Sequence, residues 1–401
     1  MGVVQHLVGD VRSSGKALVP SAGLLLSEHK RDRRVDTRLK DNLPGYPAPT
    51  TSIGQETASC PVPVQIGYRS FDRQWIIPDK RLINQPNPRL WAVRSEKQVY
   101  LTAISRSSPT SGPGLTCTAL VPDLDHYHGR GGRAFPLWLD ADTTISNVRP
   151  PVLDVLAERL GSRPSGDDVL AYLAAVCAHP GYTATFAADL ANPGVRVPLT
   201  TDPALFAEAV ELGRRVVWLH CYGQRFADPT AGRPRRAPRM DKPVAPQVLA
   251  EHPIPSDATG MPDILRHDAE TGHLLVGTGA ISPVSPAMWA YEISGVRVLT
   301  KWFSYRRRSR ERPTMGRRVS KLLDLQPPGW LPEYTSELID LLNVLGLLVG
   351  LEPRQAALLD HIVAGPLLAV TDIAPGTTTN PGRRRVSDDH TVPMFDIADP
   401  Q

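Results

Sequence analysis

The sequence lacks the features that mark zinc-binding, disulfide-bonded and membrane-spanning proteins. Its four cysteines, Cys60, Cys117, Cys177 and Cys221, are widely scattered, and no two of them stand at CxxC spacing. This scatter argues against a zinc site and a disulfide framework and favours a reducing, cytoplasmic setting. No stretch reaches the ~18 apolar residues that predict a membrane span. The N-terminus lacks the basic flank of a signal peptide.

The motifs of nucleotide-dependent and methyl-transferring enzymes are also missing. An amino-methyltransferase needs a [DNS]-P-P-[YFW] motif, whose aromatic ring stacks on a flipped base. The closest string, Gln326-Pro327-Pro328-Gly329, has no aromatic residue. Val276-Gly277-Thr278-Gly279 follows an expected strand but opens no helix, so a turn is favoured over a cofactor loop. We therefore expect no catalytic residue, no metal and no cofactor in this chain.

The residues that are present predict a mixed α/β fold with a β-rich half and a helical half. The chain has 401 residues, of which 41% are hydrophobic and 40 are prolines, about twice the usual proline share of ~5%. Alternating β-branched and aromatic residues predict strands, and apolar spacing of three and four predicts helices. The expected strands are 74–77, 98–104, 115–121, 133–138, 273–276, 291–293 and 296–299. The expected helices are 151–160, 167–178, 202–222, 331–350 and a separate short one over 352–362.

Composition divides the chain into three regions. Residues 1–60 combine prolines with a basic-acidic run and are predicted to be mostly flexible. Residues 61–370 form the expected folded domain, with a subdomain boundary near the proline- and arginine-rich stretch 228–255. Residues 371–401 are predicted to be a disordered tail.

One basic-aromatic segment is the strongest candidate for contact with DNA. Residues 301–318 hold eight basic residues and one acidic residue, a local balance of +7 against +4 for the whole chain. Arginine binds phosphates bidentately and reads guanine edges, and aromatic rings can stack on bases. The alternative is a solvated basic loop whose aromatic residues belong to the core. The candidate residues are Lys301, Trp302, Tyr305, Arg306, Arg307, Arg308, Arg310 and Arg312.

Weaker candidates lie in the N-terminal half and in the arginine-proline stretch. Arg69 and Arg73 either contact DNA or form structural ion pairs with Asp72 and Asp79, and the structural role is favoured. Lys97 and Arg106, together with Arg94, bracket an expected strand and are modest candidates for phosphate contacts. The stretch with Arg233, Arg235, Arg236 and Arg239 could add non-specific charge attraction.

The segment from Asp123 to His128 has residue types that bind divalent metals. Along an extended chain, Asp123 and Asp125 would lie on one face, with His126 and His128 on the other, which splits the ligands. A polar loop after a strand is therefore favoured over a metal site. A metal-dependent nuclease centred on these four residues remains a rival hypothesis.

Several strings, in order, resemble the C-terminal specificity region of type ISP restriction–modification enzymes over roughly residues 62–370. They are Tyr68-Arg69-Ser70-Phe71-Asp72-Arg73-Gln74-Trp75, Leu90-Trp91, Gln98-Val99-Tyr100, Val121-Pro122-Asp123-Leu124-Asp125-His126-Tyr127, Phe135-Pro136-Leu137-Trp138, Lys301-Trp302-Phe303-Ser304-Tyr305-Arg306 and Glu352-Pro353-Arg354-Gln355-Ala356. Residues 1–60 depart from the family, since they do not resemble the end of a methyltransferase domain. The segment 128–132 departs as well, because it lacks an aromatic residue before its paired glycines.

The resemblance implies a DNA target-recognition domain that chooses the sequence to be modified. In the family this region follows an adenine-specific DNA methyltransferase, so that enzyme and its S-adenosylmethionine would be supplied by a separate subunit. The expected partners are double-stranded DNA and this methyltransferase, with no membrane. Two rival hypotheses are an interaction remnant that docks on the methyltransferase through the helix 331–350, and a degenerate gene fragment.

Overall fold

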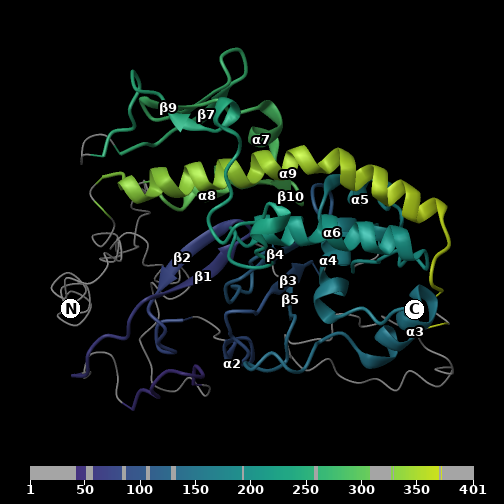
Figure 1. The fold of residues 1–401 in the computed structure, drawn as a ribbon. Coiled ribbons are helices and arrows are strands. Elements are labelled where there is room, and N and C mark those ends of the chain that lie inside the picture. The colour runs from purple at the N-terminus through teal and green to yellow at the C-terminus, as the bar shows by residue number, and fades with distance from the viewer. Residues whose placement is uncertain are drawn as a thin grey trace.

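The computed structural model describes residues 42–50, 57–83, 87–104, 109–127, 132–191, 194–256, 261–307, 327, 329–369 and 372. Helices and antiparallel sheets are mixed within it, as predicted. Figure 1 shows one long helix crossing the molecule, with a small sheet above it and the larger body below.

The β-rich part of the body consists of a hairpin and a three-stranded sheet. Strands β1 (Val64–Arg69) and β2 (Asp72–Ile76) pair antiparallel, and Phe71 lies between them with a φ of 63°. The sheet has the order β4-β3-β5, with β3 at Tyr100–Ala103, β4 at Leu115–Thr118 and β5 at Arg133–Pro136. Every residue of β3 and β4 is buried, because helices cover one side of this sheet and the hairpin region covers the other.

Four helices form the other half of the body, and they are α3 (Pro150–Leu160), α4 (Gly166–Cys177), α5 (Pro180–Thr185) and α6 (Pro203–His220). A capping box between Ser165 and Asp168 starts α4 and satisfies otherwise unpaired backbone donors. Helices α4 and α6 pack closely at Gly213, where a Cβ atom would lie 1.7 Å from the carbonyl oxygen of Ala171. Only glycine fits at this crossing.

Helix α9 (Pro332–Ala364) crosses the molecule between the small sheet and the larger body. Two helices were predicted here, but one continuous helix runs through Pro353, although proline removes a backbone hydrogen bond. By length and composition α9 could cross a bilayer. It instead contacts α4, α5 and α6 on one side and α7 (Pro286–Ala290) on the other, and Leu338, Leu341 and Leu342 have no exposed surface. Its buried apolar residues are used within the chain, and the rival hypothesis of docking on a methyltransferase through this helix stays a hypothesis.

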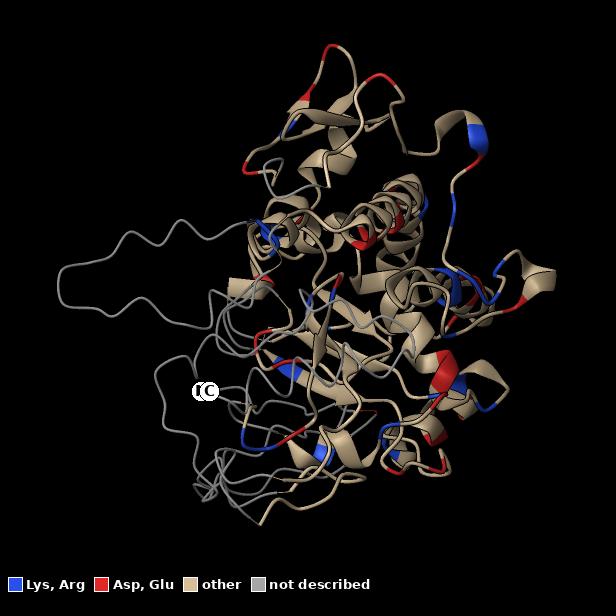
Figure 2. Cartoon of the chain, turned by 90° about the vertical axis from the view of Figure 1, so that its left-hand side faces the viewer, with Lys and Arg blue, Asp and Glu red and all other residues tan. Residues whose placement is uncertain are grey.

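A small sheet lies above α9 in Figure 1, with the order β6-β9-β8-β7. Its strands are β6 (Gln247–Val248), β7 (Leu265–Asp268), β8 (His273–Val276) and β9 (Gly279–Ser282). The stretch from Val276 to Gly279 is the turn between β8 and β9, as predicted, with Gly277 at a φ of 61°. Residues 247–285 carry five acidic residues and one arginine, and Figure 2 shows acidic positions on the loops of this sheet.

The segment 292–304 folds differently from the sequence prediction. Strands β10 (Glu292–Ile293) and β11 (Val296–Arg297) form a short hairpin, and helix α8 (Val298–Ser304) follows at once. A strand was expected over 296–299, but Val298, Leu299, Trp302 and Phe303 share the buried face of α8. The remaining short elements are α2 (Pro88–Ala92) and the 3₁₀ turns Asp189–Ala191, Pro229–Ala231 and Lys242–Val244.

Part of the N-terminal region packs against the body, contrary to the prediction of flexibility for 1–60. Leu43 is only 3% exposed and joins a small core cluster with Leu90, Trp91 and Tyr100. The tyrosine ring of Tyr46 lies edge-on to Trp91, with 5.7 Å between centroids. Most of residues 1–60 and of the predicted tail 371–401 lie outside the described residues, so the predictions for them stand as predictions.

The half-buried carboxyl group of Glu352 on α9 gives a prediction about pH. Burial raises the pKa of Glu352 to about 7 from 4.5, so its contribution to stability is complete below pH 4.5 and is lost as the pH rises through 7. Glu352→Gln imitates the protonated form and should be more stable than the wild type at pH 8 by roughly 1–2 kcal/mol, which is ~1.4 kcal/mol per pKa unit reduced for the solvent screening of a half-buried group. Urea unfolding at pH 5 and pH 8 measures this, and an equal difference at both pH values would contradict it.

Candidate nucleic-acid interface

An open, arginine-rich cleft lies in the described part of the molecule. Its volume is about 870 Å³. Several stretches of chain form it: the loop at residue 46, strands β1 and β2, the end of α2 with the turn after it, residues 119–121 after β4, residues 222–225 after α6, and residues 235–237. Five arginines and a single carboxylate, Glu96, line it. The lining arginines are Arg73, Arg94, Arg225, Arg235 and Arg236.

The floor of the cleft is held rigid by Arg225. Its guanidinium donates to the carbonyl oxygens of Gln98 at 2.8 Å, Ser95 at 3.0 Å and Ala119 at 3.4 Å. Burial lowers the pKa of Arg225, with the nearby Glu96 among the groups that oppose this. These hydrogen bonds to backbone acceptors join three walls of the cleft through Arg225.

A second fixed arginine, Arg73, lies over the ring of Tyr222 at 3.9 Å. Tyr222 adopts a φ of 52° and donates its hydroxyl to the carbonyl oxygen of Phe71 at 2.7 Å. Arg73 also pairs with Asp340 of α9 at 3.6 Å, and Asp340 pairs with Arg239 at 2.6 Å. The cleft floor is therefore joined to helix α9 through Arg73.

The rim of the cleft carries exposed cations and aromatic rings. Arg94 lies 5.0 Å from the ring of Tyr46 and 5.4 Å from that of Trp91, and it donates to the Tyr46 hydroxyl at 2.6 Å. Arg235 pairs with Glu96 at 3.0 Å, and the two side chains are 73% and 87% exposed. Arg236 is exposed as well. These three guanidinium groups can meet an anion without being uncovered first.

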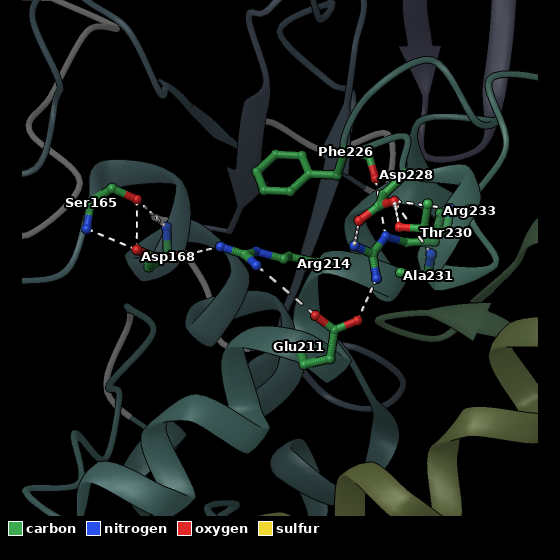
Figure 3. Close-up of polar contacts among 9 residues, drawn as sticks. All are labelled: Ser165, Asp168, Glu211, Arg214, Phe226, Asp228, Thr230, Ala231 and Arg233. Carbon is green, nitrogen blue, oxygen red and sulfur yellow. Dashed lines mark hydrogen bonds and ion pairs between the residues drawn. The ribbon is translucent and has the colours of Figure 1, made fainter.

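The stretch that carries Arg235 and Arg236 lies in the segment 228–255, where a subdomain boundary was predicted, and it is anchored to the body. Figure 3 shows its anchor, Arg233, which is buried and pairs with Glu211 of α6 at 2.5 Å and with Asp228 at 3.6 Å. Arg233 also donates to the carbonyl oxygen of Phe226 at 3.1 Å. Asp228 in turn accepts from the backbone N–H of Thr230 at 3.0 Å. The anchor fixes the position from which the two exposed arginines project.

Figure 3 also shows how this anchor is joined to α4. Arg214 of α6 pairs with Asp168, at the start of α4, at 2.6 Å, and reaches Glu211 at 4.0 Å. Glu211 thus lies between Arg214 and the buried Arg233. The same ion-pair chain holds the helix pair and the arginine stretch together.

The structure corrects the strongest sequence candidate, because Trp302 and Arg306 are buried. Arg306 pairs with Asp72 at 2.8 Å and Glu337 at 3.0 Å, and its guanidinium lies 3.9 Å from the Trp302 ring. Burial alone would lower the pKa of Arg306, but Asp72 and Glu337 outweigh it and raise the pKa. Two carboxylates satisfy this charge inside the protein, so neither Arg306 nor Trp302 can contact DNA in this conformation.

The other candidates of that segment differ in exposure. Lys301 is half-buried and lies 5.0 Å from the ring of Tyr305, which packs edge-on to Tyr68 at 4.9 Å. Arg307 is exposed. Arg308, Arg310 and Arg312, like Arg106, lie outside the described residues, and their proposed contact with DNA stays a prediction.

Arg69 and Arg73 have the structural role that the sequence favoured, but their partners differ from those predicted. Arg69 pairs with Asp123 at 2.6 Å and Arg73 with Asp340. The expected partners are engaged elsewhere, since Asp79 pairs with Arg81 at 2.5 Å and Asp72 with Arg306. Lys97 is exposed in the same turn as Glu96 and stays a candidate for phosphate contact.

The segment from Asp123 onward is a polar turn whose groups bind the hairpin. Asp123 holds Arg69, and the Nδ1 atom of His126 lies 2.8 Å from the carbonyl oxygen of Gly67. Burial lowers the pKa of His126 to about 4, which keeps it neutral. Among the described residues, no three His, Cys, Asp or Glu side chains are placed to hold a metal ion.

The sequence interpretation underrated the cleft because no single stretch contains it. Arg94, Arg235 and Arg236 were noted only as modest sources of positive charge, while Tyr46, Tyr222 and Arg225 were not singled out. An indication was nevertheless present, since residues 233–239 contain four arginines. Only the fold brings this stretch next to the turn at Glu96.

Two neighbouring arginines of one basic segment should behave differently on substitution. Arg306→Ala removes the cation that pairs with the buried Asp72 and the partly buried Glu337, and it should lower the free energy of unfolding by about 3–5 kcal/mol. Arg307→Ala removes an exposed charge and should change it by less than about 0.5 kcal/mol. Urea unfolding of both variants measures this, and equal stability of the two would place Arg306 at the surface.

Comparisons with known proteins identify a matching family and solved structures with a similar fold. A family model described as the Type ISP C-terminal specificity domain matches residues 25–341, which begins earlier than the predicted resemblance at residue 62. No curated protein matches the chain. A structure named as a DrdV–DNA complex by cryo-electron microscopy matches with 18% identity and a TM-score of 0.53, over 74% of this chain and 28% of that one.

A second solved structure is named as the ATP-dependent Type ISP restriction–modification enzyme LlaBIII bound to DNA. It matches with 13% identity and a TM-score of 0.52, over 77% of this chain and 19% of that one. At these identities the two structures support the fold alone. The chain spans less than a third of the length of either solved protein.

Proposed function

The chain belongs to the family of Type ISP C-terminal specificity domains, and from this membership we propose that it recognises a target sequence in double-stranded DNA. The arginine-lined cleft carries this proposal. Its exposed cations, Arg94, Arg235 and Arg236, stand on a floor fixed by Arg225 and Arg73. Rigid placement of the supporting groups limits the entropy that is lost when a ligand binds.

The cleft has the chemistry that duplex DNA requires. Guanidinium groups bind phosphate oxygens bidentately, and they read the O6 and N7 atoms of guanine in the major groove. The half-buried ring of Tyr46, beside the exposed Arg94, adds a flat surface for a sugar or base. The acidic sheet β6–β9 would repel phosphates, so we propose that the duplex lies on the cleft side of α9. Both solved neighbours are named as complexes with DNA.

The catalytic step belongs to another part of the system in this proposal. An adenine-N6 methyltransferase, with its S-adenosylmethionine, would act in the cytoplasm on the site that this chain selects. This chain would position DNA and hold no reacting group. The family description names specificity and no catalysis, which supports this division.

Removing the three exposed cleft arginines should weaken binding to any duplex. The triple variant Arg94→Gln, Arg235→Gln, Arg236→Gln loses up to three phosphate contacts, so the slope of log K against log salt should fall by up to ~2.7, at ~0.9 per contact. The matched control changes Arg159, Arg163 and Arg354, which are 50%, 50% and 58% exposed and lie outside the cleft. Fluorescence anisotropy across a salt series measures both. If the two triple variants behave alike, the cleft is not the DNA site.

Sequence recognition needs a separate measurement. The purified chain is mixed with random-sequence duplexes at two salt concentrations, and the retained DNA is sequenced. Enrichment of one motif is expected. Retention that depends on salt but shows no enrichment would limit this chain to phosphate binding, and no retention at either concentration would overturn the proposed function.

A further inference from the structure

We infer that Glu96 is a specificity-determining residue, which lowers the affinity for non-target duplexes and accepts a hydrogen bond from a base amino group of the target. This inference rests on the proposed function. Glu96 is the one acidic residue among those that line the cleft in the described structure, where it faces five arginines. Its carboxylate lies 3.0 Å from Arg235 and is 87% exposed.

The fold does not need this carboxylate. An ion pair between two exposed side chains contributes little to stability, because solvent screens it and both side chains lose freedom. The turn that carries Glu96 is held by other contacts, namely Arg225 on the carbonyl oxygen of Ser95 at 3.0 Å and the Ser95 hydroxyl on the N–H of Lys97 at 3.3 Å. The backbone position is fixed without the carboxylate, and the exposed ion pair with Arg235 leaves the carboxylate open to a ligand.

The same carboxylate opposes the binding of phosphates. A DNA phosphate that approaches Arg235 competes with the Glu96 carboxylate for the guanidinium. The carboxylate also repels the phosphate. Two like charges about 4 Å apart in water repel each other enough to change a binding constant by about fivefold. This repulsion acts on every duplex, so it lowers non-specific affinity whatever the sequence.

A matching base can offset the repulsion. Carboxylates accept hydrogen bonds only, and the donors on major-groove base edges are the amino groups N4 of cytosine and N6 of adenine. A target that places such an amino group at Glu96 satisfies the carboxylate, whereas other sequences leave it beside phosphates or acceptor atoms. The difference between these two situations raises the ratio of specific to non-specific affinity.

The test compares Glu96→Gln with a matched control, Glu208→Gln. Glu208 is exposed on α6 and pairs with Arg354 at 3.5 Å, outside the cleft, so both variants lose one exposed, paired carboxylate. Each protein is titrated with a random-sequence duplex and then used to select from the random pool. Thermal unfolding of all three proteins checks that stability is matched.

Glu96→Gln is expected to bind the unselected pool about fivefold more tightly than the wild type and to enrich its motif less, mainly at a position occupied by cytosine or adenine. Adding Arg235→Gln should remove most of the gain in affinity. The inference is overturned if Glu96→Gln matches Glu208→Gln, or if affinity rises with the motif unchanged. A wild-type chain that retains no duplex would instead overturn the proposed function, and this inference with it.

Discussion

The buried ion triad of Arg306, Asp72 and Glu337 is the interaction on which the rest of the structure depends. Its members come from the segment after α8, from β2 and from α9, and Arg306 also donates to the carbonyl oxygen of Arg73 at 3.4 Å. A guanidinium without water is costly unless carboxylates and carbonyls satisfy it. The triad therefore fixes the positions of the β1–β2 hairpin, α8 and α9 relative to one another. Because that arrangement fixes the backbone of Arg73, it also sets where the cleft floor begins.

Burial, and not sequence clustering, separates the arginines that hold the fold from those that can meet a ligand. Arg306 and Arg233 have side chains only 3% and 4% exposed and are held by internal carboxylates and carbonyl oxygens. Arg235 is 73% exposed, although it stands two residues from Arg233. A guanidinium offers several donors in one plane, which suits backbone carbonyls, carboxylates and phosphates equally. Local charge density consequently identifies where arginines occur, but the acceptors around each one decide its role.

The sequence predicts correctly those helices and strands whose structure is set by neighbouring residues. Helices α3, α4 and α6 follow from apolar spacing and cap residues such as Asp202, and the strands of the central sheet follow from β-branched and aromatic runs. Local rules failed where a tertiary contact overrode them. Pro353 lies inside α9 because packing on both sides stabilises the helix, and residues 298–304 are helical because Trp302 and Phe303 must face the core together. The cleft could not be predicted, since Glu96 and Arg235 are 139 positions apart.

The cleft combines a fixed floor with an exposed rim, and this division suits recognition more than catalysis. Catalysis usually depends on groups whose pKa values are shifted by burial or by neighbouring charges. The groups of the cleft floor whose pKa values are shifted, Tyr222 and Arg225, donate to backbone carbonyl oxygens. The rim carries the positive charges of three arginines and, next to them, the negative charge of one carboxylate. A surface of that kind can distinguish ligands by where their own charges and donors fall, which is what target recognition by a specificity domain requires.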